Sequence, residues 1–115
     1  MIVKWLKNPY LGAKAQRQAR EILRAAEQGV KSRQDGCYLV VLSPMEGAQL
    51  ELISLWECRR NSREDLHVLG MAASRWEAMQ LVEKIARDCL RRSGKPDFKA
   101  CFGSMAYVPG DEVLL

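Results

Sequence analysis

Apolar positions recur with a helical period near the start of the chain. They lie three or four residues apart and form one stripe: Leu11, Ala15, Ala19, Ile22 and Ala26. Asn8 and Pro9 precede the stripe as a helix cap and a first helical residue, and Gly29 follows it as a helix end. The pattern predicts a first helix from Pro9 to about Gln28, after a short N-terminal segment at 1–8.

Apolar runs in the middle of the chain predict strands. The run 37–42, CYLVVL, is too short for a helix and rich in β-branched residues, which favours a central strand. The run 49–57 alternates in part, with Leu50 and Leu52 on one face, and the turn residues at 44–47 predict a hairpin between the two. A third strand is expected at 66–72, antiparallel to the second.

A capping box predicts where the second helix begins. Ser74 stands three residues before Glu77, so we expect the helix to begin at Arg75, and Gly94 with Pro96 to end it. Its expected buried face comprises Met79, Val82, Ile85, Ala86, Cys89 and Leu90. Trp76 lies at the boundary of the polar face and is expected to be partly exposed.

The last part of the chain alternates again. Residues 98–102 predict a fourth strand with Phe98, Ala100 and Phe102 inward. In the tail at 103–115, the segments 105–108 and 112–115 flank a Pro-Gly-Asp turn and predict a small hairpin.

The predicted order is therefore α-β-β-β-α-β within a single domain, residues 1–115. Because both helices are amphipathic, we expect an α+β two-layer sandwich with both helices on one face of a four-stranded antiparallel or mixed sheet. This order resembles that of double-stranded-RNA-binding domains over roughly residues 9–92. The resemblance implies cations at the start of the second helix, where Arg75 is the only match.

Composition excludes several classes of protein. The chain has 115 residues, 48% of them hydrophobic, and no apolar stretch of about 20 residues for a membrane span, so we expect a cytoplasmic protein. The cysteines Cys37, Cys58, Cys89 and Cys101 form no C-x-x-C pair and are expected to be free, structural thiols. No Gly-rich phosphate loop or zinc motif occurs, so we expect no cofactor and no metal.

Positive charge is concentrated at the start of the chain. Residues 1–35 hold eight Lys or Arg and three acids, although the whole chain carries only +4. Opposite the apolar stripe of the first helix lie Lys14, Arg17, Arg20 and Arg24. This basic face predicts weak, salt-sensitive contact with an anion or nucleic acid, and a merely solvated helix face remains the alternative.

The function expected first is association with another protein, foremost with a second copy of the chain. Apolar residues beyond the needs of two amphipathic helices provide the candidate interface: Ile53, Leu55, Trp76, Leu114 and Leu115. Nucleic-acid binding through the basic face is the alternative. A second alternative is a small enzyme that uses His67, the only histidine, together with a thiol.

Overall fold

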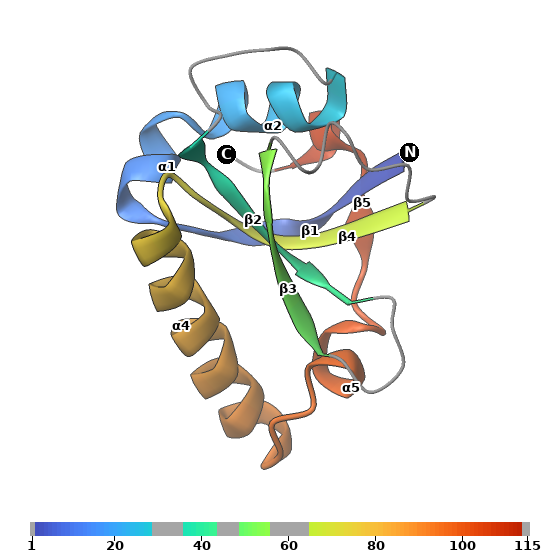
Figure 1. The fold of residues 1–115 in the computed structure, drawn as a ribbon. Coiled ribbons are helices and arrows are strands. Elements are labelled where there is room, and N and C mark those ends of the chain that lie inside the picture. Colours follow the sequence, from blue (N-terminus) through green and yellow to red (C-terminus); the bar gives the residue numbers. More distant parts are fainter. Residues whose placement is uncertain (1, 29–35, 44–48, 56–64, 114–115) are drawn as a thin grey trace.

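Five strands form one mixed sheet in a computed structural model that describes residues 2–28, 36–43, 49–55 and 65–113 (Figure 1). The order across the sheet is β3-β2-β4-β1-β5. The strands are β1 (Ile2–Leu11), β2 (Tyr38–Leu42), β3 (Leu50–Ser54), β4 (Asp65–Ala72) and β5 (Tyr107–Val108). β1 runs parallel to β4, and the other neighbours are antiparallel.

Helices flank this sheet. They are α1 (Ala13–Arg17), α2 (Ala19–Gln28), α4 (Arg75–Ser93) and α5 (Phe98–Phe102), with a 3-10 turn η2 (Gly110–Glu112) near the end. The α+β class predicted from the sequence is confirmed. The sheet has one strand more than predicted, and it is mixed.

The helices cover both faces of the sheet, whereas we expected them on one. Figure 1 shows α2 and α4 on opposite sides of the sheet. Leu39 packs in the core with α2, and its neighbour Val40 packs in a second core with α4. Successive side chains of a strand point to opposite faces, so α2 and α4 lie on opposite sides. The two-layer expectation is wrong because β2 and β4 are apolar on both faces and each face requires a cover.

Residues 2–11 form the strand β1, and not the short N-terminal segment at 1–8 and the helix start at Pro9 that the sequence predicted. β1 lies between β4 and β5, Trp5 is fully buried, and the first helix begins only at Ala13. The capping signal at Asn8 and Pro9 is overridden because the residues before and after them pair with β4 and β5. The helix is also interrupted at Gln18, which divides it into α1 and α2.

A wide bulge interrupts the pairing of β1 with β4. Trp5 is opposite Val68 and Tyr10 is opposite Gly70, so that four residues of β1, 6–9, face a single residue of β4, Leu69. Pro9 suits this place because a bulge residue needs no N–H for the ladder. The bulge turns the side chains of Lys7 and Asn8 out into solvent.

The predicted hairpin is present in the pairing of β2 with β3, where Val40 is opposite Leu52. The sequence predicted that β4 would pair with β3, but β4 pairs with β2. The partner of β4 could not be obtained from the alternation of apolar residues. Gly29, the turn at 44–47, Trp56 and Cys58 lie outside the described residues.

Residues 98–102 are a helix and not the predicted strand. The Asp97 carboxylate caps it by accepting from Ala100 N, and Gln49 Oε1 accepts from Phe98 N at 2.9 Å. Phe98 and Phe102 share a face at helical spacing as well as at strand spacing, which explains the error. Tyr107 and Val108 pair with β1, so no separate C-terminal hairpin forms within the described residues.

The second helix has the predicted ends but only part of the predicted buried face. Ile85 and Cys89 are buried and Val82 and Ala86 are half-buried, but Met79 and Leu90 are exposed, because the face toward the sheet is formed by Ala78, Leu81, Ile85 and Cys89. α4 begins at Arg75, Ser74 Oγ accepts from Glu77 N at 3.2 Å, and Gly94 ends the helix in the left-handed conformation with φ 73°. Both ends were predictable because their signals are local.

Candidate functional site

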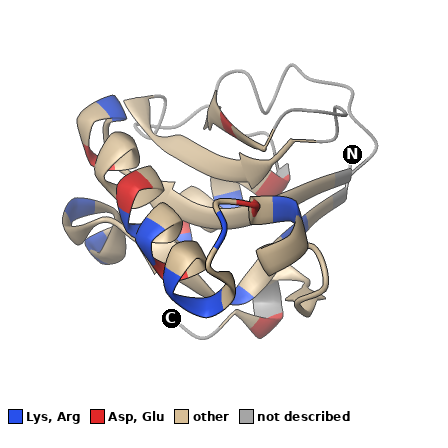
Figure 2. Cartoon of the chain, turned by 90° about the horizontal axis from the view of Figure 1, so that it is seen from below, with Lys and Arg blue, Asp and Glu red and all other residues tan. Residues whose placement is uncertain are grey.

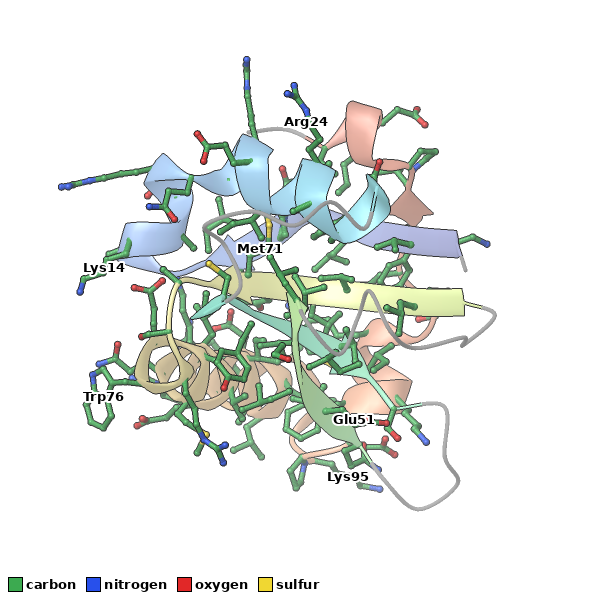
Figure 3. All side chains as sticks on the ribbon, turned by 45° about the horizontal axis from the view of Figure 1, so that its top comes forward. Lys14, Arg24, Glu51, Met71, Trp76 and Lys95 are labelled. Carbon is green, nitrogen blue, oxygen red and sulfur yellow. The ribbon has the colours of Figure 1, made fainter. Side chains whose placement is uncertain are left out.

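The four predicted anion-binding residues do not form one cluster. Lys14 and Arg17 lie on α1, Arg20 and Arg24 lie on α2, and all four are exposed. Arg17 and Arg20 line a shallow depression of about 320 Å³ where α1 meets α2, which Glu21 also lines. Figure 3 shows Lys14 at one end of the molecule and Arg24 farther along α2. The break at Gln18 separates residues that a continuous helix would have aligned.

The Glu77 carboxylate joins the start of α1 to the start of α4. It is buried and accepts from Lys14 N at 3.1 Å, Ala15 N at 3.1 Å and Ala73 N at 3.0 Å. Gly12, at the cap of α1, provides no side chain for the N–H groups of that helix, and a Cβ there would collide with the Glu77 carboxylate. The capping box indicated Glu77 but not its role in capping the other helix.

The link through Glu77 brings an exposed aromatic residue close to the basic helix. Trp76 is 74% exposed, and Figure 3 shows its ring at the same end of the molecule as Lys14. We call this region the Trp76–Lys14 end. The structure thus places at one end of the molecule two residues that the sequence presented as candidates for different functions.

Two residues of the predicted interface are buried in the core. Ile53 is 2% exposed and Leu55 is 1% exposed, and both pack on the α2 side of the sheet. They are not part of an open surface, because the sheet has a helix on each face and uses these apolar residues internally. Leu114 and Leu115 lie outside the described residues.

β3 is an edge strand whose outer backbone groups are directed away from the sheet. Leu55 N donates to Cys37 O and Ser43 N donates to Gln49 O, both at 3.0 Å. Antiparallel hydrogen bonds alternate along a strand, so the N–H and C=O groups of Leu50 and Leu52 point away from β2. The side chains of Leu50 and Leu52 are half-buried on the α4 side.

The enzyme alternative gains no support from the surroundings of His67. Its ring packs edge to face on Tyr107, with centroids 4.8 Å apart, on the α4 side of the sheet. Cys37 packs on the opposite side, where burial and then the charge of Glu77 raise the pKa of its thiol to about 11. Cys89 Sγ donates to Lys95 O at the end of α4. Cys37 and Cys89 pack in the two cores, and the raised pKa of Cys37 disfavours its nucleophilic thiolate form.

The described residues contain no group of three or more His, Cys, Asp or Glu able to hold a metal ion. Within the same ranges, no helix combines the length and apolarity that a membrane crossing requires.

Comparisons with protein-family models, with curated proteins and with solved structures found no match for this chain.

Proposed function

We propose that the protein acts by association and forms a homodimer in which β3 pairs with the β3 strand of a second copy. The observation that carries this proposal is the position of β3 at the end of the strand order. Within the described ranges β3 pairs only with β2. Outward backbone groups on such a strand are a template for a further strand.

Symmetry favours a second copy as the partner. A two-fold axis at Leu52 would set this residue opposite the partner's Leu52 and Leu50 opposite the partner's Ser54, with both leucines on the α4 side. Glu51 would then face the partner's Ile53, so the only charged residue of β3 would not oppose itself. One surface thus complements itself, as a two-fold interface requires.

β3 also carries only one of the residues that normally prevent edge pairing, the charged Glu51. Its sequence LELIS contains neither Lys nor Pro, the usual protection of an exposed edge. Figure 2 shows Lys and Arg mainly on the helices, whereas few residues of the strands are charged. The other end of the sheet is β5, which has only two residues and presents a much shorter edge.

Leu52→Pro tests the dimer directly. Proline removes the outward N–H of residue 52 but none of the hydrogen bonds between β2 and β3, so the fold should persist while the partner strand loses a donor. Sedimentation equilibrium over a concentration series should show a dimer for the wild type and a monomer for this variant. Circular dichroism verifies folding in each case.

Leu52→Val is the matched control, because it keeps the N–H and suits a strand, and it should remain a dimer. Leu50→Lys adds an edge charge without altering the backbone and should also give a monomer, which covers the case of a proline variant that does not fold. A wild type that is monomeric throughout the series contradicts the proposal. A dimer of unchanged strength in both Leu52→Pro and Leu50→Lys also contradicts the proposal.

The Trp76–Lys14 end supports a second candidate function, the binding of single-stranded nucleic acid. An exposed indole offers a stacking surface for a base, and Lys14 with Arg17 offers charge for phosphates. The observation that favours this function is the position of Trp76 beside α1, which the backbone bonds of Glu77 fix.

Fluorescence anisotropy with a labelled oligothymidylate tests this second function. Trp76→Ala should weaken binding about tenfold, as expected for the loss of one stacked base, and Trp76→Phe should retain most of it. Wild-type affinity should fall steeply with salt. Equal binding by the Ala and Phe variants, or binding that salt does not change, contradicts a stacking and phosphate site.

A further inference from the structure

The bulge in β1 borders a pocket of about 280 Å³ at the end of the sheet away from β3. Leu6, Lys7, Asn8 and Tyr10 form one wall, and Arg92 at the end of α4 contributes to the other. Phe102, Met105 and Ala106 complete the lining. Bulges are frequent beside functional sites because they redirect side chains, and here the bulge turns Lys7 and Asn8 outward at the mouth of the pocket.

The inner surface of the pocket is apolar and well supported. Leu6 and Phe102 are buried, and both belong to the core on the α4 side. The Tyr10 ring meets the Phe102 ring edge to face, with centroids 6.2 Å apart. These neighbours hold the pocket walls in place, so a ligand would meet a surface that is already formed.

The lining residues carry positive charge and no negative charge. Lys7 and Arg92 are both exposed, and Arg92 Nη1 points to Met105 Sδ at 3.8 Å, which directs the guanidinium along the pocket. The nearby acid, Asp88, accepts from the Tyr10 hydroxyl at 2.6 Å. Lys84 lies over the Tyr10 ring at 5.9 Å and adds a further positive charge. The local field therefore favours an anion.

We propose that this pocket binds a small organic anion. Its carboxylate or phosphate group would lie between Lys7 and Arg92, and its apolar or aromatic body would pack on Leu6, Phe102 and Met105. The volume limits the body to about one ring, because it lies at the lower end of the range of small-molecule sites. This site is separate from β3 and does not depend on the dimer.

Phenyl phosphate is a suitable probe because it combines one ring with one phosphate. In a titration followed by amide chemical shifts, we expect saturable changes at Lys7, Asn8 and Ala106. Arg92→Gln should weaken binding about tenfold, the usual effect of losing a charge-assisted hydrogen bond. Arg91→Gln is the matched control, since Arg91 is exposed on the same helix turn and does not line the pocket.

Ala106→Trp tests the volume independently of charge. Ala106 is exposed, so a larger side chain there should fill the pocket without disturbing the core, and binding should be lost while the melting temperature stays within a few degrees.

Three results would overturn the proposal. The first is the absence of saturable shifts with millimolar phenyl phosphate. The second is equal affinity for inorganic phosphate or for neutral benzyl alcohol, since the pocket requires both the charge and the ring. The third is binding that Ala106→Trp leaves intact, or shifts confined to the α1–α2 junction, which would place the phosphate on Arg17 and Arg20.

Discussion

Glu77 shows how one side chain can organise segments that are distant in the sequence. Its carboxylate accepts backbone N–H groups from the starts of α1 and α4, which lie more than sixty residues apart. Burial by itself raises the pKa of Glu77, but the hydrogen bonds from Ala73, Lys14 and Ala15 outweigh burial and hold the pKa below its ordinary value of 4.5. The folded state therefore stabilises the charged form.

Glu77→Gln should lower the free energy of unfolding by about 2 kcal/mol at neutral pH, because the carboxylate loses its charge-assisted hydrogen bonds. The contribution of the carboxylate is fully present above pH 4.5 and is lost as the pH falls through the lowered folded pKa. In denaturant titrations, the difference between wild type and variant should thus shrink in acid. Glu83→Gln, at an exposed position of the same helix, should change little. A difference that is constant at all pH values would contradict this role.

The elements themselves show which sequence signals are reliable. α4 was predictable at both ends because Ser74 and Gly94 act within one turn. The first eleven residues were not, because the partners of β1 are β4 and β5, and nothing near Asn8 indicates that they will pair with it. α5 was missed because five residues with Phe at each end satisfy the helical and the strand period equally.

Gly70 is required by the return of β1 from its bulge. A Cβ at this position would lie 2.6 Å from the Tyr10 carbonyl oxygen and 3.4 Å from Leu81 Cδ1. Because backbone atoms cannot move aside as flexible side chains do, Gly70→Ala should cost about 1–3 kcal/mol in unfolding free energy.

Gly36→Ala is the control, since its Cβ meets nothing within 4 Å and its stability should be unchanged or slightly higher. Thermal unfolding compares the two variants. If both substitutions change the stability equally, the backbone entropy of glycine in the unfolded chain, and not the contact of residue 70 with β1, determines that change.

At the scale of the whole molecule, local patterns predicted the elements better than their assembly. The exposure of Trp76 and of the four basic residues followed from helical periodicity. The burial of Ile53 did not, since it depends on a helix covering the second face of the sheet. The β3 edge and the pocket beside the bulge of β1 were also beyond prediction, because strand order and the presence of Lys7 and Arg92 at one pocket arise from the packing of distant segments.

The position of β1 has a consequence for the order of events during folding. β1 has a neighbour on each side, and these neighbours come from residues 65–72 and 107–108. Such non-local pairing requires the closure of long loops before any contact compensates for it, which slows folding. β1, with its buried Trp5, therefore gains its partners only when these distant segments reach it, and its pairing is expected late in folding.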